Sequence, residues 1–178
     1  GASQDAGFVP GHRPAHGERL DTPVGPLKVL HTPGHASNHL CYLLEPARLL
    51  FAGDQVMQGS TVVINPPDGD MAAYLAALQA LGEEPFDTIA PGHGFLIGEA
   101  HAAIDFLVTH RLAREHKVRL ALARHGPASL ETLTQHAYDD VPEARRALAA
   151  RSALAHLLKL EVEGRAAQQA GQWVSLEG

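Results

Sequence analysis

Three segments of the sequence share one layout that restricts the fold: a short apolar run, a turn containing glycine, and then a side chain that can bind metal. Apolar runs of this length, bounded by glycine and proline, predict β-strands. Ligands of α/β proteins bind at strand ends, so neighbouring strands would bring the three turns together. The segments are residues 27–35, 49–54 and 88–93, and they end in His35, Asp54 and His93.

These three side chains form a chemically consistent set of metal donors. Imidazole nitrogen and carboxylate oxygen suit zinc, iron or manganese. A glycine beside each donor allows a tight turn and leaves room for an ion. Taken singly, each motif has a plainer interpretation as a turn or a helix cap, so the prediction depends on their joint occurrence. We interpret His35, Asp54 and His93 as metal ligands.

Two more histidines lie four positions away from His35. His31 and His39 repeat at a spacing that places two ligands on one face of a helix in some zinc sites, but Pro33 and Gly34 argue against a helix here. We therefore expect His31 and His39 to support the ligands and not to bind metal themselves. The single cysteine, Cys41, lies in an apolar run and is interpreted as part of the core.

The first part of the chain reads as a layered α/β unit. Further strands are expected at residues 40–44, 48–52, 61–64 and 86–90. A helix is expected at residues 71–81, with Asp70 as its cap and Gly82 as its end.

From residue 99 onward the pattern becomes helical. Helices are expected at residues 99–124, 129–138 and 142–164, followed by a small hairpin at residues 165–176. Three helices and a hairpin predict a winged-helix-like module. We thus expect an α/β (α+β) chain with domains at residues 1–109 and 110–178.

Charge divides the chain in a similar place. Residues 1–109 carry 4 basic and 12 acidic side chains, whereas residues 110–165 carry 10 basic and 7 acidic ones. No segment has the length and apolar character of a membrane span or the layout of a signal peptide. The sequence therefore predicts a cytoplasmic protein that does not enter a membrane.

The motifs resemble those of a known family. His31-Thr32-Pro33-Gly34-His35, Leu50-Phe51-Ala52-Gly53-Asp54 and Ala90-Pro91-Gly92-His93-Gly94 are similar to the later metal-binding motifs of the metallo-β-lactamase superfamily. Gly59-Ser60-Thr61, His110-Arg111 and Arg114-Glu115 resemble its lactamase-beta-2-like branch, which ends in a small winged-helix domain. The similarity covers roughly residues 20–165.

The resemblance implies two divalent ions, expected to be zinc, with iron or manganese as alternatives. It makes His35 a ligand of the first ion, Asp54 the bridging carboxylate and His93 a ligand of the second. A hydroxide held by the metal would attack the substrate, so no catalytic side chain is assigned.

One family motif is absent, because His-x-His-x-Asp-His does not occur in the sequence. The chain thus resembles the C-terminal half of an αββα sandwich followed by the winged-helix domain. We expect either a truncated, incomplete form or self-association that covers the missing half, and weak metal binding by the three ligands alone.

The expected function is that of a metal-dependent hydrolase acting on a small-molecule ester or thioester, or on RNA. A glyoxalase II-like thioester hydrolase is one alternative. Another is an endoribonuclease or nucleic-acid-binding module whose α/β part is catalytically silent.

Overall fold

The computed structural model describes residues 9–177, and its contacts divide them into two compact units. The first unit holds residues 9–62 and 72–108, and the second holds residues 63–71 and 109–177. No helix within residues 9–177 has both the length and the apolar character needed to cross a membrane.

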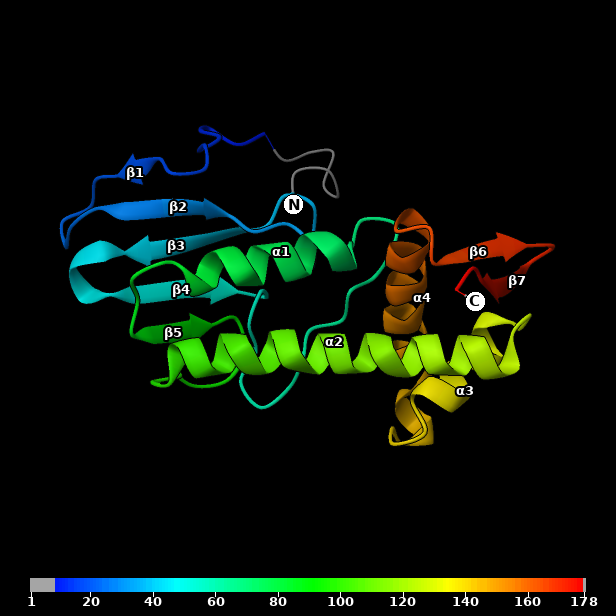
Figure 1. The fold of residues 1–178 in the computed structure, drawn as a ribbon. Coiled ribbons are helices and arrows are strands. Elements are labelled where there is room, and N and C mark those ends of the chain that lie inside the picture. The colour runs from blue at the N-terminus through cyan, green and yellow to red at the C-terminus, as the bar shows by residue number, and fades with distance from the viewer. Residues whose placement is uncertain (1–8, 178) are drawn as a thin grey trace. The chain divides into compact units, whose positions relative to one another are not determined.

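The first unit contains one sheet with strand order β1-β2-β3-β4-β5 (Figure 1). Neighbouring strands are antiparallel up to β4, whereas β4 and β5 are parallel. Consequently β2, β4 and β5 run in the same direction and end at the same edge of the sheet. The strands are β1 (Arg19–Leu20), β2 (Leu27–His31), β3 (Leu40–Leu44), β4 (Leu49–Gly53) and β5 (Thr88–Pro91), with a 3-10 turn at Glu45–Ala47.

One face of this sheet is buried at its centre. Cys41, Leu43, Leu50 and Ile89 lie on that face and are no more than 1% exposed. Helix α1 (Met71–Gly82) lies along the sheet (Figure 1), and the Tyr74 hydroxyl donates to the carbonyl oxygen of Gln55 at 3.0 Å. The helix therefore fixes the chain just beyond the end of β4.

The opposite face is apolar but more open. Val29, Tyr42 and Phe51 are opposite one another in adjacent strands on that face. Val29 is buried, Tyr42 is half-buried and Phe51 is 42% exposed. Among the described residues the first unit has no second sheet to cover this face.

The second unit is built from three helices and a hairpin. It comprises the later part of α2 (Ala100–His125), α3 (Leu130–Ala137), α4 (Arg146–Val162), β6 (Ala166–Gln169) and β7 (Gln172–Ser175), with a 3-10 turn at Glu143–Arg145. Its core includes Leu133, Leu157 and Trp173. Two backbone hydrogen bonds join Ala128 to Trp173, at 2.8 and 3.1 Å, so the hairpin is tied to the start of α3.

The expected elements are confirmed with one exception. Residues 61–64 form no strand, although Val62 and Ile64 are buried. The apolar alternation there reflects burial alone, because no neighbouring strand pairs with this segment within the described chain. The short strand β1 (Arg19–Leu20) was not predicted, since two residues are too few to show a periodic pattern.

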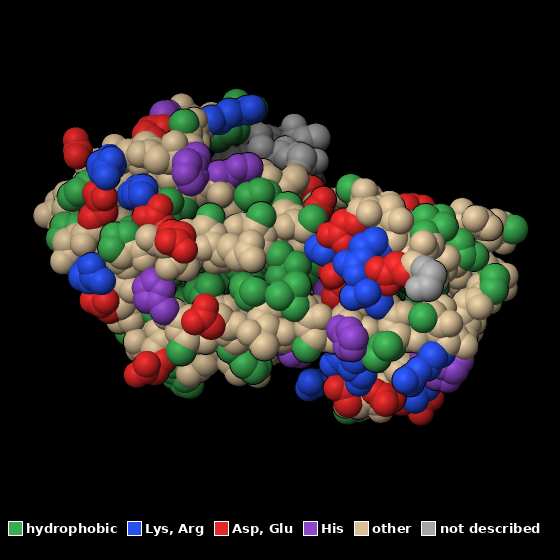
Figure 2. All heavy atoms as spheres, in the orientation of Figure 1, with side chains coloured by type: hydrophobic (Ala, Val, Ile, Leu, Met, Phe, Trp, Pro, Cys, Tyr) green, Lys and Arg blue, Asp and Glu red, His purple; other side chains and the backbone are tan. Residues whose placement is uncertain are grey.

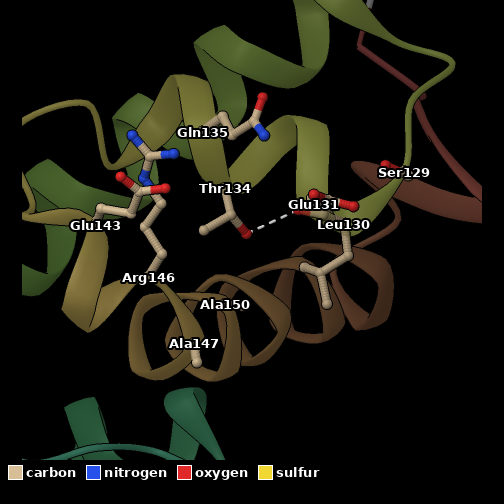
Figure 3. A pocket seen from close by; sticks show the side chains of 9 residues that line it. All are labelled: Ser129, Leu130, Glu131, Thr134, Gln135, Glu143, Arg146, Ala147 and Ala150. Carbon is tan, nitrogen blue, oxygen red and sulfur yellow. Dashed lines mark hydrogen bonds between the residues drawn. The ribbon is translucent and has the colours of Figure 1, made fainter.

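A hollow of about 730 Å³ lies between α3 and α4 in the second unit (Figure 3). Its floor includes Ala147 and Ala150, and the charged side chains that line it are Glu131, Glu143 and Arg146. The hollow is thus open and of mixed charge.

Charged side chains of both signs gather on one face of the second unit (Figure 2). Arg165 pairs with Glu177 at 2.5 Å, and Arg119 pairs with the same carboxylate at 2.9 Å. In the same unit, Glu115 is only 6% exposed and lies 2.9 Å from Lys159 Nζ and 3.5 Å from His156 Nδ1. Burial alone would raise the pKa of Glu115, but the interactions with His156 and Lys159 lower it to about 2.

We predict that the ion pair of Glu115 stabilises the second unit above mildly acidic pH. The lowered pKa means that this stabilisation is complete above the ordinary value of 4.5 and is lost as the pH falls from about 4.5 to about 2. Glu115→Gln removes the buried carboxylate beside Lys159 and His156, while Lys159 keeps Glu163 at 2.6 Å, and it should lower the free energy of unfolding by about 1–3 kcal/mol at pH 7. Fluorescence of Trp173, the single tryptophan, would report unfolding of this unit.

The matched control is Glu143→Gln, which changes an exposed glutamate of the same unit. It should alter stability by less than about 0.5 kcal/mol. Equal stabilities and equal acid sensitivities of the two variants would show that the buried pair contributes nothing.

Candidate metal centre

His35 lies in the loop that joins β2 to β3. The loop is closed by a hydrogen bond from the Thr32 backbone N–H to the His39 carbonyl oxygen, at 2.9 Å. Gly34 has a φ of +134°, and a Cβ at this position would lie 2.3 Å from the Cα of Tyr74. Glycine therefore lets the loop pack directly against the backbone of α1.

Asp54 follows β4 in a tight turn. Gly53 has a φ of +49°, and the N–H of Gln55 donates to the carbonyl oxygen of Ala52 at 3.0 Å. Gln55 is fully buried and its carbonyl oxygen accepts the hydrogen bond from Tyr74. The backbone on either side of Asp54 is thus held while its own side chain stays partly open, at 44% exposed.

His93 lies in the loop that follows β5. The N–H of Gly92 donates to the carbonyl oxygen of Gly53 at 2.7 Å, which joins this loop to the turn at Asp54. Gln58 binds the loop at two points: its N–H donates to the His93 carbonyl oxygen at 3.2 Å, and its Oε1 accepts from the Phe95 N–H at 2.8 Å. These bonds place His93 beside Asp54.

The structure brings the three residues identified from the sequence together around one carboxylate. His35 Nε2 lies 3.9 Å from Asp54 Oδ2, and His93 Nε2 lies 3.4 Å from Asp54 Oδ1. The strands that carry them are not all neighbours, because β3 lies between β2 and β4. Their carboxyl ends nevertheless lie at the same edge of the sheet. β3 is antiparallel to both β2 and β4, so β2 and β4 run in the same direction, and β5 is parallel to β4.

The donor set matches a divalent transition metal ion in its chemistry. Two imidazole nitrogens face different oxygens of one carboxylate, an arrangement that is compatible with a carboxylate shared by two ions. Within residues 9–177, however, no three His, Cys, Asp or Glu side chains converge closely enough to hold an ion by themselves. The three side chains therefore fit part of a metal centre and would need further ligands.

His31 and His39 make different contacts from the three central residues. His31 Nε2 donates to the Ser37 carbonyl oxygen at 3.0 Å, within the same loop. His39 Nδ1 lies 2.8 Å from Thr32 Oγ1. Burial lowers the pKa of His39, and the nearby His35 lowers it further, whereas Asp54 opposes the shift.

Several residues that fix the centre were not identified from the sequence. Gln58 gave no signal, because a glutamine in a loop is common and its two contacts are with residues far along the chain. Gly92 was expected to allow a tight turn and to leave room for an ion, but its close approach to Asp54 was not predicted. A Cβ at Gly92 would lie 2.5 Å from Asp54 Oδ1, so its lack of a side chain is what admits the carboxylate.

Two sequence-family models match the chain. A model described as the metallo-beta-lactamase superfamily matches residues 3–93. A second, described as a beta-lactamase associated winged helix domain, matches residues 129–173. The second match covers α3, α4, β6 and the start of β7 in the second unit.

Comparisons with individual proteins give the same family as the two models. The chain is 31% identical to a beta-lactamase-like protein 2 homolog of Caenorhabditis elegans, over 78% of this chain and 45% of that protein. It is 33% identical to an atrochrysone carboxyl ACP thioesterase of Aspergillus chevalieri, over 66% of this chain and 39% of that protein. The crystal structure of a metallo-beta-lactamase family protein from Thermus thermophilus aligns with a TM-score of 0.78 at 25% identity, over 90% of this chain and 53% of that one. The chain thus spans less than half of the length of both curated relatives.

We predict that Gly92→Ala displaces Asp54. The added methyl group would overlap Asp54 Oδ1 and would lie 2.8 Å from the carbonyl carbon of Gly53. Overpacking of this kind should lower the free energy of unfolding by about 1–3 kcal/mol. The control is Gly98→Ala, where a Cβ would meet nothing within 4 Å. Equal stabilities of the two variants in denaturant unfolding would contradict the close approach of Gly92 to Asp54.

Proposed function

The chain belongs to the metallo-β-lactamase superfamily, and on this basis we propose that His35, Asp54 and His93 are metal ligands of a divalent-metal-dependent hydrolase. The observation that carries the proposal is the placement of two imidazole nitrogens at opposite oxygens of the Asp54 carboxylate. Members of the superfamily bind divalent metals. Zinc suits this mixture of nitrogen and oxygen donors, and iron or manganese would also be compatible.

The residues of the chain would divide the work between binding and positioning. His35 would bind one ion, His93 a second, and Asp54 would contact both. A bound divalent ion supplies Lewis acidity, which polarises a carbonyl group and makes water a stronger nucleophile near neutral pH. Gln58 and Gly92 would hold His93 and Asp54 side by side, since their contacts join the two loops.

A small thioester or ester is the substrate class that we favour. Support comes from the relatives whose names identify thioesterases. This class includes the substrates of the glyoxalase II-like alternative, which are also thioesters.

RNA is less well supported by the charges of the second unit. Its basic side chains include several that are already paired with acidic ones, and the hollow between α3 and α4 contains two glutamates and one arginine. Electrostatic binding of a polyanion needs free positive charge. The paired basic residues are Arg114, Lys117, Arg119, Lys159 and Arg165.

Self-association stays a prediction from the sequence.

Metal titration tests the ligand assignment directly. Zinc is added to the chain in competition with a chromophoric chelator, and the affinity is compared with that of His35→Ala, Asp54→Asn and His93→Ala. Loss of a residue that only supports a ligand weakens metal binding by roughly 10–100-fold. Each of the three variants should lower the zinc affinity by more than this. His116→Ala, which removes an exposed histidine of α2, should bind as the unmodified chain does.

Two results would overturn this assignment: unchanged zinc binding in all three variants, or a tightly held two-ion cluster that survives them. The hydrolase proposal is tested separately by release of free thiol from a small acyl thioester. Activity should require added zinc and should be lost in Asp54→Asn. Zinc-dependent hydrolysis that persists in Asp54→Asn would exclude this site as its source.

A further inference from the structure

Three side chains and one carbonyl group form a row of polar contacts across β2, β3 and β4, beside the candidate centre. His39 Nδ1 lies 2.8 Å from Thr32 Oγ1, which lies 3.3 Å from Cys41 Sγ. The Cys41 thiol donates to the carbonyl oxygen of Ala52 at 3.4 Å. Thr32, Cys41 and Ala52 are at most 2% exposed, so the Thr32 hydroxyl and the Cys41 thiol depend on the row and not on bulk water, whereas the Ala52 carbonyl oxygen also accepts from the Gln55 N–H at 3.0 Å. We call this set the His39 row.

The hydrogens of the His39 row have a preferred direction. A carbonyl oxygen only accepts, so the thiol hydrogen points to Ala52. The thiol has one hydrogen, and the Thr32 hydroxyl must therefore donate to Cys41 Sγ. Thr32 Oγ1 is then left to accept a hydrogen from His39 Nδ1. The reverse direction uses only two of the three contacts, which is less favourable for buried groups.

The state of the thiol agrees with this direction. Burial raises the pKa of Cys41 to about 12, so the sulfur keeps its hydrogen at neutral pH and can donate. The cysteine is therefore a link in the row and not a nucleophile.

The other ring nitrogen of His39 faces the turn that carries Asp54. A Cβ at Gly53 would lie 3.0 Å from His39 Nε2, so glycine leaves this nitrogen uncovered. Among the described residues no hydrogen-bond donor is paired with it. When the ring hydrogen is on Nδ1, Nε2 carries an open lone pair.

We propose that Thr32 and Cys41 position His39 as its Nδ1–H tautomer, so that Nε2 accepts a hydrogen bond from a hydroxyl, amide or water donor bound at the candidate centre. The tautomer stands independently of metal binding, whereas the acceptor role rests on the function proposed above. A lone pair at this point attracts O–H and N–H groups and repels oxyanions. His39 would therefore favour the donor-bearing part of a substrate or an ordered water.

Long-range ¹H–¹⁵N NMR of the full, metal-free chain tests the tautomer. At pH of about 8, where ordinary imidazoles are neutral, His39 should show a protonated Nδ1 and an unprotonated Nε2. His31 and His101 serve as internal references, because their Nε2 atoms donate to carbonyl oxygens and require the opposite tautomer. The His39→Gln variant identifies the His39 signals. A protonated Nε2 on His39 would overturn the proposal.

Two substitutions of Thr32 separate positioning from a general structural role. Thr32→Val keeps the shape but removes the hydroxyl, and His39 should then lose its preference for Nδ1–H. Thr32→Ser keeps a hydroxyl and should restore the preference, while His31 and His101 stay unchanged in both variants. Backbone amide spectra show whether each variant is folded. A folded Thr32→Val chain with an unaltered His39 tautomer would exclude Thr32 as the positioning group.

Addition of zinc tests the acceptor role and separates it from the metal assignment. The ring nitrogens of His35 and His93 should shift, and the Nε2 signal of His39 should move without gaining a hydrogen. If His35 and His93 shift while His39 Nε2 does not, the acceptor role is wrong. If neither His35 nor His93 responds, the metal assignment is wrong and the tautomer result still stands.

Discussion

The common direction of β2, β4 and β5 is the constraint on which the candidate centre depends. Strands rise about 3.3 Å per residue, so reversing β5 would carry His93 to the far edge of the sheet, roughly 15 Å from Asp54. Parallel pairing of β4 and β5 requires a long crossover connection, and α1 provides it. The same helix then meets the loop of His35 through Gly34 and the turn of Asp54 through Tyr74. One element thereby sets the strand direction and positions two of the three turns.

Close backbone approach, more than side-chain length, brings the ligands together. Gly34 lies against the backbone of α1, Gly92 lies against Asp54, and Gly53 lies against the ring of His39. At each position a Cβ would meet an atom at 3.0 Å or less. Because packed groups cannot shift freely to accept a methyl group, these contacts limit how far the loops can move apart. The glycine beside each ligand thus has a steric role, and at Gly34 and Gly53 this adds to the freedom of glycine at positive φ.

Local pattern was sufficient to predict most of the elements and the three central residues. The four helices lie within four residues of their expected bounds, and His35, Asp54 and His93 each follow a strand and a glycine turn. Residues 61–64 form no strand, because a strand needs a pairing partner and the alternation of apolar residues indicates only burial. Gln58 acts through a contact with a residue 37 positions along the chain, and Thr32 acts through partners seven and nine positions away, so the apolar pattern reveals neither role. The order of the strands also depends on pairing between segments that are far apart in the sequence, and this order brings the predicted turns together.

The candidate centre combines rigid supports with open ligands. Thr32, Gln55 and Tyr74 are at most 2% exposed, whereas the side chains of His35 and His93 are 32% and 67% exposed. Because the buried supports hold the ligand side chains in place, little conformational entropy is lost when an ion binds, and this favours binding. Exposure has the opposite effect, because water competes for the ion and weakens charge interactions at the site. It follows that the described residues specify where an ion would lie, while its affinity depends on what covers His35, His93 and the open face at Phe51.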